Sequence, residues 1–565
     1  MTRPLHLDGV PLARIGVVGS GPVADRLAAS LAHHGADVVA LSADAGGSDP
    51  GALRDVQLVI VGGPDTPADT RRGIALAGRF AAPAVPVVTT SVHTPYAALA
   101  GLLDRPERLV VARLGEPRIG RVVELVEGGA DARVSDAVAG VFKQLGHTVL
   151  RVRETGGLVV DSLVLAMLDR AAGVVERGEA TAAELDDAMR LGCGLPEGPL
   201  RMLDGIGLDV ALASLTDLYA RRGPAAPAPT LLLRRMAAAG FTGEGGGRGF
   251  HHYSEGRPQE TPGRATSAEH VVRPVRRVGV VGAGTMAAGI AEVFLLGGHS
   301  VRLVGRSSRR AADAIGAVRE GLRQRRIADQ EAEAYLSRCE GTADLADLAD
   351  CDLVVEAVAE DLTVKRELLA RLGRVCRPGA VLATTTSSLP VIECAMATGR
   401  AADVIGLHFF NPAPAMALVE VVPTLRTAAD VRATALELCR RLGKHPVVCP
   451  DRTGFLVNAL LFPYLNDALR LVQDGVVEPA ALDTAMRSGC GFAIGPLRLV
   501  DVVGADVAQA VLRRLHDELG GAALAPVRLL DELVAAGDLG QKAGRGVRDH
   551  VRRRSHVPSV AGRAA

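Results

Sequence analysis

The sequence predicts an α/β domain followed by an all-helical domain, and it predicts that this pair occurs twice in tandem. The evidence for the repeat is that residues 189–209 align without gaps to residues 486–506, with 12 of 21 positions identical. Each half also begins with an apolar run, a glycine-rich turn and a helical segment, from Ile15 and from Val278. A chain of 565 residues is too long for one hydrophobic core. We therefore expect two related halves of two domains each.

Within each half the hydrophobic pattern changes once. Short apolar runs such as Val278–Val281 and Leu353–Val355 alternate with helical segments, which predicts a parallel sheet wrapped by helices. Beyond Gly454 longer apolar stretches with helical spacing follow. The polar run 254–274 contains three prolines and predicts an exposed linker. The expected domains are an α/β domain at 1–153, a helical domain at 154–253, the linker at 254–274, a second α/β domain at 275–450, a second helical domain at 451–549 and a tail at 550–565.

The two α/β domains differ in length at one place. The span from Gly298 to Leu353 is 55 residues, whereas the matching span from Gly35 to Leu58 is 23. We expect the additional residues to form a helical hairpin at about 308–346. Its first helix is rich in arginine, which indicates either a solvated basic helix or a binding surface for a phosphate-rich ligand.

The composition excludes several classes of protein. Lys+Arg and Asp+Glu both number 64, so the chain lacks the net positive charge of a nucleic-acid-binding protein. No stretch of about 18 uncharged apolar residues occurs, and the first residues lack the apolar core of a signal peptide. We therefore expect a cytoplasmic protein without a membrane segment. The eight cysteines lack metal-ligand spacing, which predicts reduced thiols and no metal site.

A glycine-rich turn in each half has the pattern of a dinucleotide-binding loop. Gly282, Gly284 and Ala287 lie between an apolar strand and a helix, the context that the Rossmann-like fingerprint requires. The two glycines permit a tight turn and close approach of a pyrophosphate, and the alanine lets helix and strand pack closely. The first half repeats the arrangement from Gly19, but Pro22 removes a backbone N–H donor. We expect nucleotide binding in the second half, and in the first half either weaker binding or a relic of the fold.

The end of the next strand bears on the choice of cofactor. An NAD site usually offers an acidic side chain to the ribose 2′-hydroxyl about 20 residues beyond the loop. Here Gly305 occupies that position, and Arg306 and Ser307 follow it. Guanidinium and hydroxyl groups can hold a 2′-phosphate that an acid would repel, so the sequence favours NADP over NAD. The alternative is that these arginines only begin the basic hairpin.

Four motifs of the second half occur together, namely VEAVAEDLTVK at 355–365, TTTSSLP at 384–390, GLHFFNPAPAMALVEVV at 406–422 and LGKHPVVCPDRTGFLVN at 442–458. With them the sequence closely resembles the 3-hydroxyacyl-CoA dehydrogenase family, which includes 3-hydroxybutyryl-CoA dehydrogenases. The first half resembles this family more distantly. The resemblance implies two tandem copies of a Rossmann-like dinucleotide-binding domain and a helical dehydrogenase C-terminal domain, with a degenerate N-terminal copy and a role in fatty acid metabolism.

The chemistry of alcohol oxidation selects residues from the same motifs. Loss of a hydride from a secondary alcohol needs a base that works near pH 7, and His408 is the candidate. The resemblance implies that Glu420 pairs with this imidazole, that Ser387 hydrogen-bonds the substrate oxygen and that Asn458 helps to hold substrate and histidine in register. Taken singly, the histidine could belong to the core, the serine to a turn and the asparagine to a helix cap. Their combined spacing favours the catalytic roles.

The resemblance also places Glu360 and Lys365 near the nicotinamide ribose. Lys365 is one of only four lysines among 64 basic residues, which favours a position that needs a compact ammonium group. The sequence departs from the family pattern at Thr385, where asparagine is usual, and at the closing segment KAGRGVR of residues 542–548. These departures concern details of substrate and cofactor more than the type of reaction.

In the first half the catalytic histidine and asparagine are replaced. The alignment places Arg113 at the position of the histidine and Asp161 at that of the asparagine, whereas Ser91 and Glu124 retain the serine and the glutamate. An arginine cannot accept a proton in the reaction, because its pKa stays above about 12. We therefore expect the first half to be catalytically inactive.

The leading interpretation is an oxidoreductase that interconverts a 3-hydroxyacyl-CoA and a 3-oxoacyl-CoA by hydride transfer with NAD or NADP, with its active site in the second half. Two alternatives remain: the same chemistry on an acyl-carrier-protein thioester, or a non-catalytic dinucleotide-binding scaffold. Members of the family commonly dimerise through the helical domain. The resemblance therefore implies an intramolecular pseudo-dimer of the two helical domains, and it leaves a further homo-oligomer open. No nucleic-acid or membrane partner is expected.

Overall fold

The first half of the chain forms a seven-stranded sheet. The computed structural model describes residues 4–42, 49–62, 66–92, 94–223, 228–259 and 271–556. The strand order is β4-β3-β5-β6-β7-β8-β9, and neighbouring strands are parallel except for the antiparallel pair β7 and β8. The strands are β3 (Arg14–Val18), β4 (Asp37–Leu41), β5 (Leu58–Val61), β6 (Val87–Thr89), β7 (Leu109–Leu114), β8 (Val122–Glu127) and β9 (Thr148–Arg153).

The second half repeats this order and adds one strand. Its sheet has the order β14-β13-β12-β15-β16-β17-β18-β19, with only β17 and β18 antiparallel. The central strands are buried on both faces, as expected of their continuous apolar runs. The strands are β12 (Arg277–Val281), β13 (Ser300–Val304), β14 (Cys339–Thr342), β15 (Leu353–Glu356), β16 (Val381–Thr384), β17 (Val404–Phe409), β18 (Leu418–Val422) and β19 (His445–Val448).

The segment present only in the second half is more than a helical hairpin. It contains α11 (Ser308–Gln324) and α12 (Asp329–Leu336), but β14 follows and pairs in parallel with β13. The expected hairpin at 308–346 was therefore wrong in its second part. β14 has the sequence CEGT and none of its residues is fully buried, so an apolar run was absent from the sequence.

Helices cover both faces of each sheet. In the second sheet, α10 packs against β12 and β13, and α13 lies against β16. The helices that cover the first sheet are α1 (Pro22–His33), α2 (Pro67–Phe80), α3 (Tyr96–Ala100) and α4 (Ala132–Gln144), and those of the second are α10 (Thr285–Leu296), α11, α12, α13 (Leu362–Val375), α14 (Val391–Ala397) and α15 (Ala429–Arg441).

After each sheet the described chain is helical. The first set is α5 (Val159–Glu176), α6 (Ala182–Cys193), α7 (Pro199–Ile206), α8 (Leu208–Arg222) and α9 (Leu231–Ala238). The second set is α16 (Val457–Gln473), α17 (Pro479–Thr484), α18 (Pro496–Val503), α19 (Ala505–Leu519), α20 (Arg528–Ala535) and α21 (Val547–His556). None of the helices in the described ranges is long and apolar enough to cross a membrane.

The repeated sequence segment has the same structural role in both sets. Asp186 accepts a hydrogen bond from the backbone N–H of Leu200 at 2.8 Å, at the start of α7. Asp483 accepts the equivalent bond from Leu497 at 2.9 Å, at the start of α18. A buried carboxylate thus satisfies the first N–H groups of a helix in each half. The two aspartates lie just before the repeated segment and make an equivalent contact to its helix in each half.

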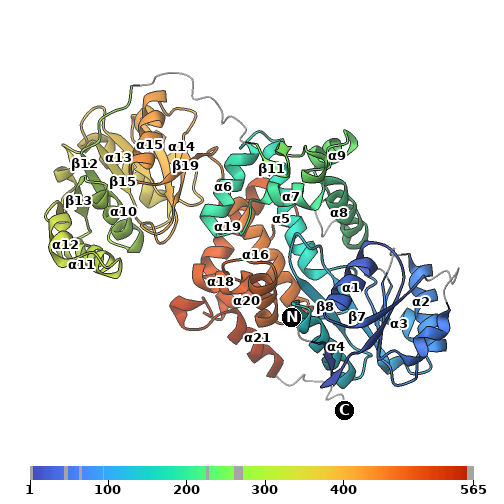
Figure 1. Ribbon diagram of the computed structural model, residues 1–565. Coiled ribbons are helices and arrows are strands. Elements are labelled where there is room, and N and C mark those ends of the chain that lie inside the picture. Colours follow the sequence, from blue (N-terminus) through green and yellow to red (C-terminus); the bar gives the residue numbers. More distant parts are fainter. Residues whose placement is uncertain are drawn as a thin grey trace, which may run out of the picture.

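The two helical sets pack against each other between the two α/β domains (Figure 1). α5 packs along α16, and Leu168 and Leu465 belong to one buried cluster that draws on both halves. Arg170 donates a hydrogen bond to Asp467 across this contact at 2.7 Å. These two residues are 297 positions apart, the offset of the repeat, so they occupy equivalent positions in the two halves.

Each sheet also contacts the helices of the other half. In the first sheet, the N–H of Arg153 in β9 donates to the carbonyl of Val476 at 2.9 Å. In the second sheet, His445 of β19 pairs with Asp187 of α6 at 3.3 Å. The last strand of each sheet is therefore an edge that the other half covers, which protects its unpaired backbone groups.

The expected linker and tail contain more structure than the sequence indicated. The linker begins with the hairpin of β10 (Tyr253–Ser254) and β11 (Arg257–Pro258), and near its end Arg273 pairs with Asp403 at 2.6 Å and with Asp430 at 2.8 Å. Its middle, 260–270, lies outside the described residues. The expected tail from 550 begins inside α21, where His550 Nδ1 lies 2.8 Å from a carboxylate oxygen of Asp538.

The contact between the two helical sets gives a first prediction. Asp467→Asn should lower the free energy of unfolding by about 1–3 kcal/mol, because Arg170 loses the charge of its partner in a mostly buried contact. Urea unfolding followed by circular dichroism measures this change. An unchanged unfolding midpoint would show that the ion pair contributes nothing to the contact between the halves.

Candidate active site

The glycine-rich loop of the second half has the geometry of a phosphate cradle. Gly282 has a φ of 142°, and a Cβ there would lie 2.3 Å from the carbonyl oxygen of Ala357. A Cβ at Gly284, the residue before α10, would meet nothing within 4 Å, so the start of α10 faces open space. Ala287 is fully buried beneath the turn. The loop therefore fits a dinucleotide pyrophosphate held by the N–H groups at the helix start.

The residues after β13 are subject to a steric restriction that the sequence did not indicate. A Cβ on Gly305 would lie 2.6 Å from the backbone nitrogen of Ala311, because α11 passes directly over it. Arg306 is exposed, and Ser307 is the N-cap of α11 and accepts a hydrogen bond from the N–H of Arg310 at 3.3 Å. Position 305, where an NAD site usually has an acidic residue, thus has no space for a side chain unless the backbone moves.

His408 and Glu420 lie directly opposite each other on the antiparallel strands β17 and β18. Nδ1 of His408 lies 2.6 Å from Oε2 of Glu420, which is completely buried. The other oxygen of Glu420 accepts hydrogen bonds from the N–H groups of Leu456 and Val457, both at 3.0 Å. These groups begin α16, so one carboxylate joins the sheet to the helical domain. With Nδ1–H donating to Glu420, Nε2 of the neutral imidazole is left as a proton acceptor.

Two aromatic rings fix the histidine from its sides. The ring centroid of Phe410 lies 4.6 Å from that of His408, and that of Phe455 lies 5.6 Å away. Phe455 is fully buried and has a φ of 47°, a left-handed conformation that is rare for a large side chain. His408 itself is only 7% exposed. The imidazole is therefore held in one orientation by packing as well as by its carboxylate.

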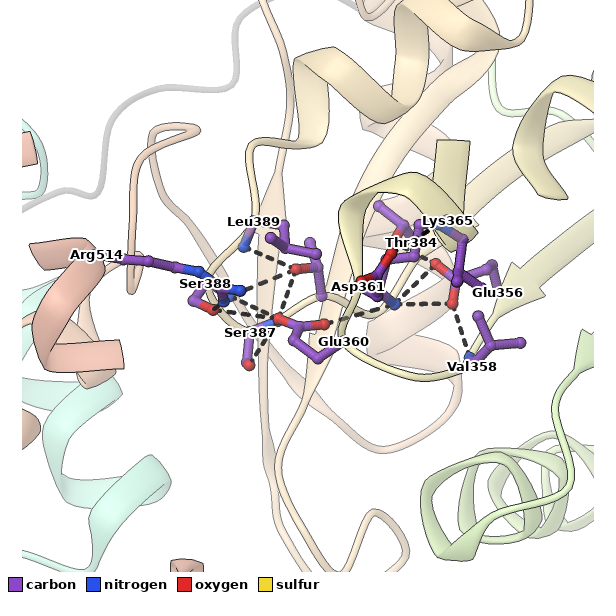
Figure 2. Close-up of polar contacts among 12 residues, drawn as sticks. Glu356, Val358, Glu360, Asp361, Lys365, Thr384, Ser387, Ser388, Leu389 and Arg514 are labelled. Atoms are coloured by element: carbon purple, nitrogen blue, oxygen red, sulfur yellow. Dashed lines mark hydrogen bonds and ion pairs between the residues drawn. The ribbon is translucent and has the colours of Figure 1, made fainter. Parts of the chain in front are cut away.

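Ser387 and Asn458 lie together on the other side of the start of α16. Nδ2 of Asn458 donates to the backbone carbonyl of Ser387 at 3.4 Å. The hydroxyl of Ser387 donates to Oε1 of Glu360 at 3.0 Å, and its N–H donates to the same oxygen at 2.8 Å. Figure 2 shows the carboxylate of Glu360 beside Ser387 and Ser388, to both of which it is hydrogen-bonded. Asn458 follows Val457 directly, so the two pairs of candidate residues meet at the first turn of α16.

Lys365 is a buried neighbour of the site. It is 1% exposed, and its Nζ donates to both oxygens of Glu356, at 2.8 and 3.0 Å, and lies 3.6 Å from Glu360 (Figure 2). Burial raises the pKa of Glu360, but the charge of Lys365 and the hydrogen bonds from Thr386 and Ser387 outweigh this and lower it overall. Lys365 thus carries a buried positive charge between Glu356, to which it is hydrogen-bonded, and Glu360.

Several residues of the site were missed in the sequence. Glu356 anchors Lys365, and it also accepts from the hydroxyl of Thr384 at 2.7 Å. Its position at the carboxyl end of β15 was an available signal, because ligand sites of such sheets lie at that edge. Lys444 donates to the carbonyls of Ala413 and Met416 at 2.7 and 2.8 Å and so holds the loop that joins β17 to β18. No sequence pattern indicated that contact.

The corresponding place in the first half keeps the architecture but not the base. Arg113 lies opposite Glu124 on β7 and β8, and the two oxygens of Glu124 accept from the N–H groups of Val159 and Val160. Arg113 is 2% exposed and donates to the carbonyl of Thr155 at 2.8 Å. Burial raises the pKa of Glu124 and of Asp161, each to about 7. Arg113 thus occupies the place of the imidazole and holds the segment before α5 by its hydrogen bond to Thr155.

Comparison with known proteins agrees with this geometry. The model of the 3-hydroxyacyl-CoA dehydrogenase NAD binding domain matches residues 277–452. The model of the C-terminal domain of the same family matches twice, at residues 157–253 and 454–550. The repeat recognised in the sequence is therefore present in the helical domains.

Relatives of known class match the second half. A probable 3-hydroxybutyryl-CoA dehydrogenase of Deinococcus radiodurans is 39% identical over 274 residues, which are 48% of this chain and 98% of the relative. A 3-hydroxybutyryl-CoA dehydrogenase of Mycobacterium tuberculosis is 41% identical over 278 residues, 48% of this chain and 97% of the relative. A crystal structure of (S)-3-hydroxybutyryl-CoA dehydrogenase from Ralstonia eutropha is 35% identical, covers 48% of this chain and 98% of its own, and has a TM-score of 0.47.

These matches and the site agree on one assignment. The family models span more than half of the chain, and the motifs that carry the resemblance supply the paired histidine and glutamate, the serine and asparagine, and the glycine-rich loop. The chain belongs to the 3-hydroxyacyl-CoA dehydrogenase family.

Proposed function

We propose that the second half interconverts a 3-hydroxyacyl-CoA and a 3-oxoacyl-CoA by hydride transfer. The observation that carries this proposal is the bond between His408 and the buried Glu420, beside a glycine-rich loop that fits a dinucleotide. A pure nucleotide-binding scaffold has no need of that pair, which argues against the non-catalytic alternative. The names of the relatives support the CoA thioester as the substrate, and an acyl-carrier-protein thioester remains the alternative.

The proposed reaction follows from the orientation of the imidazole. A bound nicotinamide cofactor supplies the hydride acceptor for alcohol oxidation. Nε2 of His408 takes the hydroxyl proton, while Glu420 keeps the proton on Nδ1 and stabilises the imidazolium that forms. The hydroxyl of Ser387 donates to Glu360 and can accept a hydrogen bond or turn to donate one to the substrate oxygen. The side-chain amide of Asn458 donates to the backbone carbonyl of Ser387 and so helps to fix the loop that contains this serine.

For the cofactor we propose NADP in preference to NAD. The family model establishes an NAD binding domain, and the finer choice rests on the residues after β13. No carboxylate stands at Gly305, whose Cβ position is closed by α11, while Arg306 is exposed beside the N-terminus of that helix. A guanidinium and the first N–H groups of a helix both favour a phosphate.

We further propose that the chain is a tandem duplication that works as an intramolecular pseudo-dimer in the cytoplasm, with the domain division given above except that the last helix, α21, extends past residue 550. Two observations support it. α5 and α16 pack together with equivalent residues, Arg170 and Asp467, in contact, and each sheet edge lies on the helices of the other half. Arg113 in place of the base supports the assignment of the first half as the inactive copy.

Turnover of acetoacetyl-CoA tests the assignment of the base. His408→Ala should lower kcat by a factor of about 10² to 10⁴, the range of a positioned acid or base. The matched control is Arg113→Ala at the equivalent place of the first half, which should leave kcat within about twofold. Wild-type turnover by the His408 variant would refute the assignment. A wild-type protein that reduces no 3-oxoacyl thioester would favour the scaffold.

Parallel assays with NADH and NADPH test the cofactor proposal. The wild type should prefer NADPH, and Arg306→Ala should raise the KM for NADPH about tenfold or more with little change for NADH, because it removes a charged contact to the 2′-phosphate. Gly305→Asp is a poorer test of the cofactor preference, because its side chain would meet the backbone of Ala311. A strong preference of the wild type for NADH would overturn the proposal.

The raised pKa of Asp161 gives a prediction for stability. Burial raises it from 3.8 to about 7, so the folded state holds a proton that the unfolded state releases between these values. This group therefore stabilises the fold fully below about pH 4, and its contribution is lost as the pH rises through 7. Asp161→Asn should melt near the wild-type temperature at pH 4.5 and above it at pH 8, as measured by scanning calorimetry. An equal difference at both pH values would contradict this account.

A further inference from the structure

A residue of the inactive half reaches the loop that carries the active site. Glu179 lies between α5 and α6, and its Oε2 is 2.9 Å from Nη2 of Arg452, in the loop before α16. The two side chains are 15% and 12% exposed, so this ion pair is largely shielded from water. The attraction between the two charges is therefore stronger than in an ion pair at the surface.

Arg452 in turn holds the backbone of the active-site loop. Its Nε donates to the carbonyl oxygen of Phe455 at 3.1 Å. Phe455 packs on the ring of His408, and the N–H groups of the next two residues bind Glu420. A continuous set of contacts thus runs from Glu179 to both members of the catalytic pair.

The backbone that Arg452 holds is strained. Phe455 has a φ of 47°, whereas its equivalent in the first half, Leu158, has an ordinary φ of −81°. A non-glycine residue in this region costs of order 1–3 kcal/mol and persists only where its surroundings enforce it. The strain therefore occurs in the half that has the histidine and not in the half that lacks it.

The ion pair is also absent from the equivalent place of the other half. With the repeat offset of 297, Arg452 corresponds to Thr155 and Glu179 to Val476. Neither substitute carries a charge, and this contact is instead a backbone hydrogen bond from Arg153 to Val476 at 2.9 Å. The ion pair therefore occurs only on the side of the interface that adjoins His408, where Arg452 also binds the carbonyl of Phe455.

We infer that Glu179 of the inactive half is a positioning residue for the active site of the other half. It holds Arg452, which keeps Phe455 in the conformation that orients His408 and Glu420. This inference rests on the proposed function, because it assigns a role in the same reaction. It also gives the catalytically inactive half a part in catalysis.

Kinetics of Glu179→Gln test the inference. The variant should lower kcat by about tenfold to a hundredfold, the size of effect that a small displacement of reacting groups produces. The KM for the cofactor should change by less than about twofold, because among the described residues no backbone hydrogen bond joins the glycine-rich loop to this loop. Wild-type kcat in this variant would overturn the inference.

The matched control is Asp467→Asn, which breaks another shielded ion pair between the halves, with exposed fractions of 14% and 21%, that does not reach the site. It should lose stability but keep kcat within about twofold. An equal loss of kcat in this control would reduce Glu179 to a merely structural role. In a double-mutant cycle, Glu179→Gln should have no further effect on kcat when Arg452→Gln is already present, and full additivity would contradict the proposed route.

A second measurement separates this inference from the proposed function. Hydrogen exchange followed by mass spectrometry reports the protection of the N–H groups of Leu456 and Val457 without any turnover. Glu179→Gln should raise deuterium uptake in 452–458 and Asp467→Asn should not. If the wild type proves inactive on acetoacetyl-CoA, the proposed function fails, and unchanged uptake in the Glu179 variant is the result that rejects the positioning role.

Discussion

The carboxylate of Glu420 is the one interaction on which the arrangement of the second half depends. It is fully buried, and it accepts from the imidazole of His408 with one oxygen and from two N–H groups at the start of α16 with the other. A carboxylate withdrawn from water is tolerated only where such charge-assisted bonds replace its hydration. The same group therefore orients the imidazole of His408, caps a helix and fixes the helical domain on the sheet. Loss of this group would disturb catalysis and domain packing together.

The first half shows which part of this arrangement is architectural. Glu124 makes the same two bonds to the start of α5, although Arg113 has replaced the imidazole. The carboxylate is thus retained where no proton transfer is expected, because the junction of sheet and helix needs it. The second half differs from this shared frame by the histidine, the asparagine and the strained phenylalanine.

Much of the fold was predictable from the sequence because the information is local. Apolar runs marked the buried strands, and the 297-residue offset marked equivalent helices. β14 was missed, since an exposed edge strand with the sequence CEGT has no apolar run. The family motifs named His408, Glu420, Ser387 and Asn458, and the structure brings them to the first turn of α16.

The rest of the site depends on contacts between distant segments that no spacing reveals. The place of Lys365 near the nicotinamide ribose stays a prediction, and its burial between Glu356 and Glu360 could be found only in the structure. Gly305 was interpreted by charge alone, whereas the passage of α11 over it sets a steric limit. The pair of Glu179 and Arg452 joins residues 273 positions apart in different halves, so only the packed structure could show it.

Because both halves lie on one chain, residues on the two sides of the interface between them can be substituted independently. In a homodimer every substitution appears on both sides of the two-fold axis, so a contact cannot be improved on one side without altering the other. Here Arg170 can face Asp467, and a glutamate can serve one side while a valine serves the other. Covalent linkage also keeps the two surfaces at a high effective concentration however dilute the protein is. Substitutions in one half can thereby accumulate without a matching change in the other half.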